Sequence, residues 1–520
     1  MRTLSKPRPV EWLYLAGGLV LLLRYLWFMD DAFVYFRYVD NLLFLRIGLV
    51  YNHGEYVEGF SSPIWVGVLS LLRAVHLNYL AIIRSIAVAS FVLFWYMLVQ
   101  LNRRMSPEGP VINFPLVYLG FTYGVLSYFS SGVETPLVQV AAIMYALFIL
   151  HPSSRPLQIV VALSPLLRHE LILPLAICGI WYWGLGRRFP LAMLIAFLAS
   201  FGSWMAFRIY YYADLFPNPF YLKDTVYLSQ GLVYLHNTLS TYKAYVVAAI
   251  FLVLGFLLRK RGIDFAVNRR LVMLIAALPV VIYVVKIGGD ARHYRYLAFP
   301  FCLATCALGG MLEHAYAAFG QSRRRWLLPV AGPVLAVVTA LAFPHQLDKH
   351  PIYSDVDGRV IDGISDAAGH RTKPASQYSY WGSKVTIGDL RSYRNQHPEF
   401  EYTEVGANGW CHLNYLHYNR RIVHTLGLTE PVLGRVQMES HRPAHKHRLR
   451  PMAKEIVEIC LSGDHVGRGM YRAAVERGIA PPWVQQNLQT IEVIESKAFN
   501  RHDFIENLKL AFTFTARIHP

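Results

Sequence analysis

Apolar residues are collected into long runs that are separated by short polar loops. A helix that crosses a membrane needs ~20 consecutive, mainly apolar residues. The runs therefore predict a mainly α-helical, polytopic transmembrane bundle with about 11 spans. They fall at about 10–28, 80–101, 111–129, 134–150, 156–168, 171–186, 189–211, 242–258, 270–287, 295–316 and 325–343.

The loops between these runs alternate in charge, and six of them are rich in Lys and Arg. Short basic loops stay on the cytoplasmic side of a membrane, so the N-terminus is predicted inside and residues 344–520 outside. Only one crossing fits between the outer loop 30–62 and the inner basic loop 103–104, so the short run 64–72 is predicted to be a re-entrant or interfacial helix. The basic loops are Arg2-Lys6-Arg8, Arg103-Arg104, Arg155, Arg187-Arg188, 259–270 and Arg323-Arg324-Arg325.

Composition supports a membrane protein and limits the alternatives. The chain is 54% hydrophobic and 14% aromatic, which is unlike an ordinary soluble domain. Most of its net charge of +17 belongs to residues 1–343, because residues 344–520 hold 22 Lys and Arg against 19 Asp and Glu. No basic stripe interleaved with aromatic residues occurs, so nucleic acid is not an expected partner. Of the five cysteines, Cys411 and Cys460 share the polar tail, and whether they pair stays open.

The tail, residues 344–520, is polar and contains no long apolar run. A segment of about 175 residues is long enough to fold by itself. We therefore expect a transmembrane domain over 1–343 and an extracytoplasmic α+β domain over 344–520. Within the tail, 384–387 and 456–459 are predicted strands, whereas 471–477 and 504–510 are predicted helices.

The first outer loop brings several carboxylates to the membrane boundary. Asp30 and Asp31 follow the first apolar run directly, and Glu58 lies later in the same loop. In the structural alternative, Asp31 caps the next segment, whose apolar face is expected to lie flat on the membrane. In the chemical interpretation, a carboxylate at this boundary deprotonates or holds a sugar hydroxyl. Asp30 and Asp31 are the candidate catalytic residues.

Four further outer segments place charged or polar side chains beside apolar runs. Charged groups near membrane depth are costly and commonly line a functional cavity, although each alone can be an interfacial ion pair. Arginine suits a lipid phosphate, because its planar fork of donors matches the phosphate oxygens. The candidates are Glu134; Arg168, His169 and Glu170; Asn218 and Lys223; and Asp290, Arg292, His293 and Arg295.

Signals for other chemistry are weak. His441 and His445 are four residues apart, but Pro443 between them argues against a helical metal site. The sequence contains neither a Gly-rich phosphate loop ending in Lys-Ser/Thr nor a Gly-x-Ser-x-Gly elbow. Nucleotide hydrolysis and serine-hydrolase chemistry are therefore not expected.

Taken together, the outer segments resemble a known family. The run DDAFVYFRYVDNLL and the following GLVYNHGEYVEGFSSPIW are similar to the first periplasmic loop of bacterial GT-C polyprenyl-phosphosugar glycosyltransferases. The nearest family is the terminal β-(1→2) arabinofuranosyltransferase of mycobacterial cell-wall synthesis. Two departures are His169, where proline is expected, and Arg292-His293, where relatives vary. The other similar blocks, in the same order, are SGVETPL, LLRHEL, DLFPNPFYLK, GGDARHYRYLAFP, RRIVHTLGLTEPVLGR and RPAHKH.

The resemblance implies a multi-pass enzyme of the bacterial inner membrane. Such an enzyme moves a sugar from a polyprenyl-phosphate donor to a glycan or glycolipid acceptor on the extracytoplasmic face. Asp30 and Asp31 correspond to the catalytic carboxylates, and the basic candidates, Lys223 and Arg292 included, correspond to the holders of the donor phosphate. Because the donor carries no nucleotide diphosphate, neither a cofactor nor an obligatory divalent metal is expected.

Three other functions remain compatible with the sequence. A transporter or flippase of lipid-linked sugars would show two matching halves and charges within the spans. A non-catalytic membrane assembly protein would tolerate Asp31→Asn. A ligase or polymerase that uses diphosphate-linked donors would release polyprenyl diphosphate instead of the monophosphate.

Overall fold

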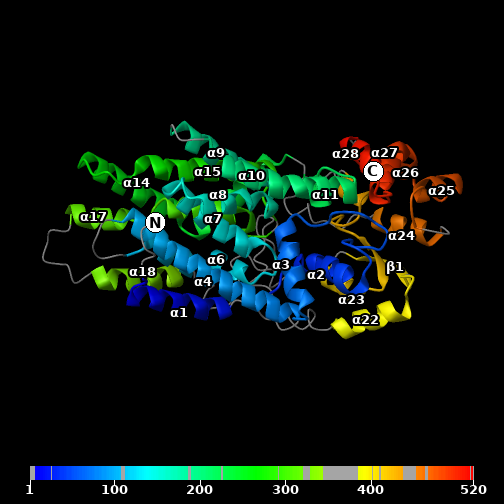
Figure 1. Ribbon diagram of the computed structural model, residues 1–520, viewed down its shortest axis with the longest axis horizontal. Helices are drawn as coiled ribbons and strands as arrows, with labels where there is room; N and C mark the ends of the chain where they lie inside the picture. The colour runs from blue at the N-terminus through cyan, green and yellow to red at the C-terminus, as the bar shows by residue number, and fades with distance from the viewer. Residues whose placement is uncertain are drawn as a thin grey trace. The chain divides into compact units, whose positions relative to one another are not determined.

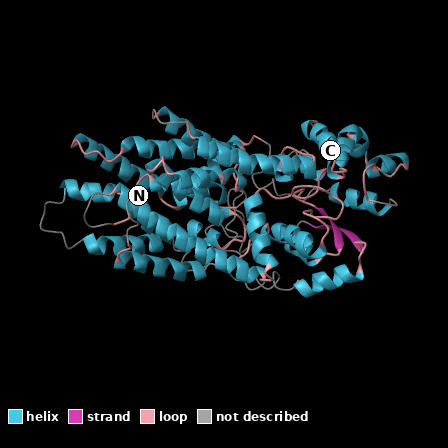
Figure 2. Cartoon of the chain, in the orientation of Figure 1, coloured by secondary structure: helices cyan, strands magenta, loops and turns pink. Residues whose placement is uncertain are grey.

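The computed structural model describes residues 6–24, 26–106, 112–185, 189–223, 226–290, 292–319, 328–342, 385–400, 402–408, 411–436, 452–462, 466–513, 515 and 517–518. Helices dominate these residues, and the strands form one short pair (Figure 2). The prediction of a mainly helical protein is therefore confirmed. The chain divides into two compact units, each assembled from separate stretches of sequence. Unit 1 comprises residues 1–28, 83–197 and 226–375, and unit 2 comprises residues 29–82, 198–225 and 376–520.

Unit 1 is built from helices that follow the predicted apolar runs (Figure 1). The exception is α13, which forms over a polar stretch where no element was expected. The helices are α1 (Pro9–Arg24), α4 (Tyr79–Met105), α5 (Phe114–Phe121), α6 (Tyr123–Phe129), α7 (Thr135–Leu150), α8 (Arg155–Ala162), α9 (Ile172–Gly184), α10 (Leu191–Phe197), α13 (Leu228–Thr241), α14 (Ala244–Lys260), α15 (Val267–Lys286), α16 (Ala298–Cys306), α17 (Met311–Phe319) and α18 (Leu328–Ala342). The first residues of α4 belong to unit 2, which includes residues 29–82. The helix that starts with α10 continues into unit 2 at residue 198.

Four helices among the described residues are long and apolar enough to cross a membrane. They are Tyr79–Met105, Leu191–Tyr212, Val267–Lys286 and Arg295–Ala318, and α13 with α14 adds a fifth if this bent pair is one span. The count of 11 thus stays a prediction. The run 111–129 is not one continuous helix, because Thr122 adopts an extended conformation between α5 and α6. Helix α3 (Pro63–Ala74), at the predicted re-entrant or interfacial run, is too short to cross a bilayer.

Unit 2 combines the first outer loop, the segment 198–225 and the tail. Its two strands are parallel, with Glu404 opposite Arg420 and Asn408 opposite His424. The boundary predicted at residues 343 and 344 lies outside the described residues and stays a prediction. The elements of unit 2 are α2 (Ala32–Asp40), α3, α11 (Ser203–Tyr212), α12 (Asn218–Lys223), α22 (Ile387–Gln396), β1 (Glu404–Asn408), α23 (Cys411–Leu416), β2 (Arg420–His424), α24 (Met452–Ser462), α25 (Met470–Glu476), α26 (Pro482–Gln486), α27 (Leu488–Ala498) and α28 (Phe504–Phe512).

Helix α2 is buried on all sides, so the expectation that it lies flat on a membrane is wrong. The reason is Arg37, whose side chain points into the unit and donates hydrogen bonds to four backbone carbonyls. These are the carbonyls of Tyr51 at 2.8 Å, Asn414 at 2.5 Å, His417 at 3.1 Å and Arg420 at 2.8 Å. A charged side chain saturated in this way is compatible with burial. Arg37 therefore joins the first outer loop to the tail.

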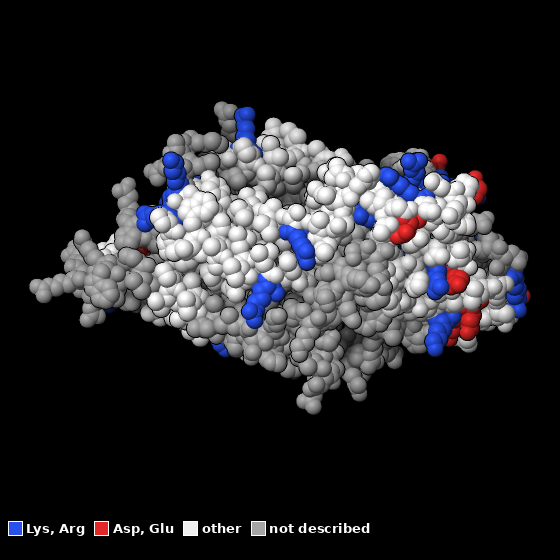
Figure 3. Space-filling model, turned by 90° about the horizontal axis from the view of Figure 1, so that it is seen from below, with Lys and Arg blue, Asp and Glu red and all other residues white. Residues whose placement is uncertain are grey.

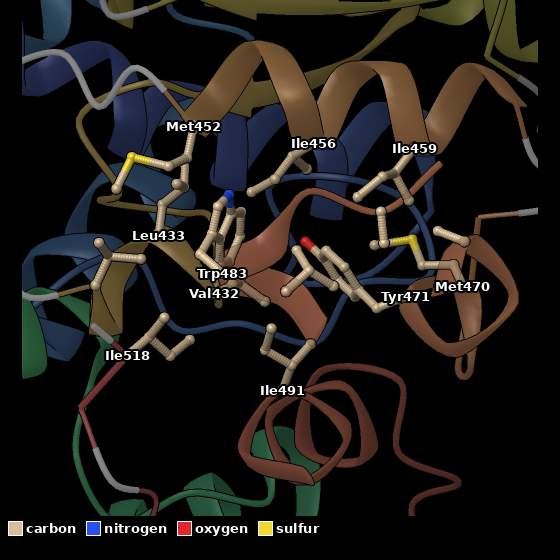
Figure 4. Packing of buried hydrophobic residues seen from close by; sticks show 14 of the residues in the cluster. Val432, Leu433, Met452, Ile456, Ile459, Met470, Tyr471, Trp483, Ile491 and Ile518 are labelled. Carbon is tan, nitrogen blue, oxygen red and sulfur yellow. The ribbon is translucent and has the colours of Figure 1, made fainter. Parts of the chain in front are cut away.

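The core of the tail is an apolar cluster contributed by four helices and the segment before them (Figure 4). Ile456 from α24 and Ile491 from α27 are fully buried in it, beside Tyr471 and Trp483. Burying one such aliphatic side chain contributes about 1.5–3 kcal/mol. The cluster accordingly stabilises the part of unit 2 that follows β2.

Two tail elements differ from the sequence prediction. The predicted strand 456–459 lies inside α24, because Ile456 and Ile459 project onto the apolar cluster at helical spacing. The predicted strand 384–387 gives way to the start of α22, where Thr386 and Asp389 form a reciprocal capping box. The predicted helices 471–477 and 504–510 are confirmed by α25 and α28.

The surface charges of the described residues are unevenly distributed. On the face shown in Figure 3, acidic and basic side chains lie beside one another at the end where Figure 1 draws the tail helices. Elsewhere on this face the surface is mostly uncharged, with isolated basic side chains. The uncharged part agrees with helices that face lipid.

Candidate functional site

The loops of unit 1 gather two arginines around one carboxylate. Glu134 directly precedes α7, Arg168 lies in an extended conformation before the turn His169–Leu171, and Arg295 opens the turn that leads into α16. The side chains of Arg168 and Arg295 approach the same Glu134 Oε1, at 3.7 and 3.8 Å. Both guanidinium groups also face the ring of Tyr296, at 4.3 and 5.7 Å from its centroid. We call Arg168 and Arg295 the arginine pair.

Two further carboxylates contact the arginine pair, Glu170 at Arg168 and Asp290 at Arg295. Arg168 Nε donates to Glu170 Oε1 at 2.6 Å, which is a short, charge-assisted hydrogen bond. Arg295 lies 3.7 Å from Asp290 Oδ2. The contacts to Glu134 and Asp290 are longer than a normal hydrogen bond, whereas the contact to Glu170 is not. Neighbouring acids thus orient the arginine pair, and the contacts of both arginines with Glu134 are longer than a hydrogen bond.

The loop 288–297 owes its shape to glycine and to buried tyrosines. Gly288 and Gly289 both have positive φ, +80° and +71°, and a Cβ on Gly289 would meet the ring of Tyr234 at 2.4 Å. The Tyr234 hydroxyl donates to the carbonyl of Arg292 at 2.9 Å. These contacts fix the backbone that precedes His293.

His293 itself is held by two neighbours. Its Nε2 lies 2.7 Å from the hydroxyl of Tyr242 and its Nδ1 lies 2.9 Å from Asn237 Oδ1. Because the amide oxygen can only accept, Nδ1 of His293 donates to Asn237. The two contacts of His293 therefore orient the backbone that presents Arg295.

The two candidate aspartates occupy different environments in unit 2. Asp30 is buried, and its Oδ2 accepts a hydrogen bond from the amide of Cys411 at 3.0 Å. Asp31 is half-buried and precedes α2, but its side chain does not cap that helix. The structural alternative for Asp31 is therefore not supported. Cys411 Sγ lies 3.3 Å from His424 Nε2, and Cys460 Sγ lies 2.9 Å from Arg421, so these two cysteines do not pair with each other.

Glu58 and Asn218 are engaged within unit 2. Glu58 forms a fully buried ion pair with Arg208, and burial raises the pKa of Glu58 although Arg208 opposes the shift. The Asn218 amide donates to the carbonyls of Gly427 at 2.8 Å and Glu430 at 3.0 Å, and its oxygen accepts from Arg435 at 3.1 Å. Glu58 therefore connects the first outer loop to α11, and Asn218 connects α12 to the tail segment 427–435.

The structure thus brings together some predicted site residues and separates others. Glu134, Arg168, Glu170, Asp290 and Arg295 form one connected cluster in unit 1, with His293 in the same loop. His169 opens the turn after Arg168, and Lys223 ends α12, each half-buried. No group of three or more His, Cys, Asp or Glu side chains suited to a metal occurs among the described residues. The segment 441–447, with His441 and His445, lies outside the described residues.

Several residues of these networks were not predicted from the sequence. Tyr296, Tyr242 and Asn237 carry no charge and lie in or beside apolar runs, so nothing in their pattern singled them out. Arg208 offered a usable signal, because it lies inside the predicted span 189–211, where a charged residue needs a partner.

Comparison with known proteins identifies two similar sequences. The chain is 27% identical over 518 residues to the terminal β-(1→2)-arabinofuranosyltransferase of Mycobacterium tuberculosis, covering 82% of this chain and 81% of that protein. It is 25% identical over 334 residues to the protein of the same name from Corynebacterium glutamicum, covering 53% of this chain and 46% of that protein. No family model matches the chain. The resemblance to the arabinofuranosyltransferase family is therefore confirmed, and with it the assignment as a membrane glycosyltransferase.

Proposed function

We propose that this protein transfers an arabinofuranose-like sugar, or another pentose or hexose, from a polyprenyl-phosphate donor to a glycan or glycolipid of the cell envelope. The observation that carries the proposal is the arginine pair, which offers two oriented guanidinium groups beside an aromatic ring. Planar cationic forks of this kind match the oxygens of a phosphate. The named activity of the two relatives supports the sugar transfer.

In the proposed reaction, the bond between the anomeric carbon and the donor phosphate breaks, and polyprenyl phosphate leaves with the bonding electrons. Arg168 and Arg295 stabilise the negative charge that develops on the leaving phosphate. An acceptor hydroxyl forms the new bond to the anomeric carbon and gives its proton to a carboxylate. The chemistry requires no metal, so treatment with EDTA should leave the rate unchanged.

The two aspartates receive different roles in this proposal. Asp31, half-buried and directly before α2, is the reacting carboxylate, as the resemblance of the surrounding loop implies. Asp30 is a positioning residue, since the Cys411 amide holds its carboxylate in place. Asn218 also positions the tail segment 427–435, and Glu58 positions α11 through Arg208; the substrate-binding role of both residues stays a prediction.

The proposed location is the inner membrane of a bacterium, with the N-terminus cytoplasmic and the tail extracytoplasmic. The alternating basic loops support this orientation. A reporter fused after Arg104 should behave as cytoplasmic, and one fused after Leu347 as extracytoplasmic. The reverse result at Arg104 would contradict the interfacial placement of α3.

The deciding experiment uses the purified protein in lipid with a panel of polyprenyl-phosphate sugars. Mass spectrometry follows the release of polyprenyl phosphate by the wild type and by Asp31→Asn, Asp30→Asn and Asp264→Asn. We expect Asp31→Asn to lower release by about 10²–10⁴-fold, since a positioned acid or base contributes that much. Asp30→Asn should lose less, because the new amide oxygen still accepts from Cys411, and Asp264→Asn, in an exposed loop, should resemble the wild type.

Other outcomes of this experiment are equally informative. Wild-type release by Asp31→Asn would refute the role given to that residue. Binding of the donor without release by any protein would favour a transporter. Release of polyprenyl diphosphate from a diphosphate-linked donor would favour the ligase or polymerase.

A further inference from the structure

A large apolar groove opens among the helices of unit 1, and neither arginine of the arginine pair lines it. It encloses about 710 Å³ and is lined mainly by α14, α15 and α16. Its polar lining is sparse, and the Thr305 hydroxyl and the Tyr118 hydroxyl are hydrogen-bonded to backbone carbonyls at 2.8 and 2.5 Å. Over most of its length the groove therefore offers a ligand only apolar contacts.

The groove results from a bend in the chain. α13 and α14 meet at an angle of 71°, where Lys243 has a positive φ of +53°. After this bend α14 packs against α13 and α17. Small side chains deepen the groove, notably Gly255 on α14 and Ala304 on α16. From Ala244 to Arg259 the helix rises about 22 Å, which exceeds one leaflet of a hydrocarbon core ~30 Å thick.

One end of the groove is strongly basic. Arg259 lines it, and three more basic residues are exposed nearby: Lys260 at the end of α14, Arg261 in the turn and Arg269 in the first turn of α15. Asp264 is the only acid between residues 259 and 270. Arg270 also lines this end, but its guanidinium donates to the carbonyls of Phe265 and Ala307. A long apolar groove with a cationic mouth is complementary to a molecule that joins a hydrocarbon chain to a phosphate.

We propose that this groove binds one anionic phospholipid, with an acyl chain between α14 and α16 and the head-group phosphate at Arg259. The charge at the mouth favours an anionic lipid over a zwitterionic one. The exposure of Leu252 and Phe256, 74% and 68%, is natural on helices that face lipid and does not by itself select an occupant. The basic residues at the mouth of the groove select an anionic lipid. The lipid site is distinct from the arginine pair and independent of sugar transfer.

The test exposes the purified full chain to an equimolar mixture of phosphatidylglycerol and phosphatidylcholine and counts retained lipids by native mass spectrometry. The wild type should retain one phosphatidylglycerol molecule in preference to phosphatidylcholine. The triple variant Arg259→Gln, Lys260→Gln and Arg269→Gln should lower that preference at least tenfold, whereas Arg155→Gln, at an exposed arginine outside the groove, should not.

A second variant probes the groove itself. Ala304→Phe fills its floor and should remove the retained lipid, while Val20→Phe on the exposed face of α1 should leave it bound. Equal retention of the two lipids by the wild type would overturn the proposal, and so would retention unchanged in both groove variants. Displacement of phosphatidylglycerol by added polyprenyl phosphate would also overturn it, by giving the groove to the donor lipid.

Discussion

Buried charges are arranged differently in the two units. In unit 2, arginine and carboxylate meet at hydrogen-bond distance, as in Arg421 with Glu55 at 2.5 Å and Arg435 with Asp214 at 2.6 Å. In unit 1, Arg168 makes one contact of this length, with Glu170 at 2.6 Å, but Arg168 and Arg295 both lie 3.7–3.8 Å from the Glu134 carboxylate that they share. In an ion pair at hydrogen-bond distance, each charge compensates the other, and the pair connects two segments of the chain. Two arginines that share one acid at longer range place two guanidinium groups around a single point, an arrangement that suits a leaving phosphate.

The strongest way to test this comparison is to break a complete pair in unit 2. Arg421→Met leaves Glu55 buried without its cation, and Glu430, also buried nearby, loses a stabilising charge. Removing one partner of a buried pair costs about 3–5 kcal/mol. We expect a large fall in the midpoint of thermal unfolding of the protein in lipid, accompanied by loss of activity.

The matched control removes both charges. Arg421→Met combined with Glu55→Leu should recover part of the lost stability, since no unpaired charge then remains at this position. If Arg421→Met alone unfolds at the wild-type temperature, the ion pair is not structural.

The second prediction concerns the arginine pair. Arg295→Gln should leave the unfolding midpoint close to that of the wild type and lower the rate of polyprenyl-phosphate release by about 100-fold or more, as removal of one donor to a developing charge does. Steady-state kinetics with donor concentration varied would check it. Arg155→Gln serves as the control, and an effect on stability without an effect on rate would contradict the distinction between the two units.

The comparison also shows which features were predictable from sequence. The apolar runs predicted most helices of unit 1. A segment that crosses lipid must be apolar and must form a helix, so the two properties occur together in the sequence. They did not predict α13, whose stretch is polar, or the break at Thr122. In the tail, residues 456–459 looked like a strand because they are rich in β-branched residues, and packing on the apolar cluster overrode that preference.

Among the candidate residues, charge was a good guide to position but a poor guide to role. The acidic and basic residues of the outer loops were identified, and five of them meet in unit 1. Nothing in the sequence distinguished them from Glu58 or Asn218, whose partners Arg208 and Arg435 are about 150 and 217 residues away. Such pairings depend on tertiary contacts, which a local pattern does not contain.

A third prediction uses pH to examine the acid next to the Arg421 pair. Burial raises the pKa of Glu430 to about 7, whereas an unfolded glutamate has a pKa near 4.5. The folded protein therefore binds more protons between these values, and its stability falls as pH rises from 4.5 to 7. Glu430→Gln should flatten this dependence by roughly 1–3 kcal/mol across the interval. Unfolding midpoints between pH 4.5 and 8 would measure it.

The control for this prediction is Glu404→Gln on β1, where the glutamate side chain is 57% exposed. That variant should keep the wild-type pH dependence. Glu495, whose pKa burial also raises to about 7, remains in both variants, so Glu430→Gln should reduce the slope and not abolish it. An unchanged slope would mean that Glu430 is ionised in the folded protein.

The smallest effect is expected at an ion pair of unit 2 that is short but exposed. Arg472 Nε lies 2.5 Å from Glu492 Oε1, as close as the buried pair of Arg421, yet the Arg472 side chain is 58% exposed. Water and salt screen such a pair, and ordering two long side chains offsets its attraction. Arg472→Gln should therefore leave the unfolding midpoint unchanged within error, at low and at high salt. A clear loss of stability at low salt would show that distance alone, and not burial, makes the pairs of unit 2 structural.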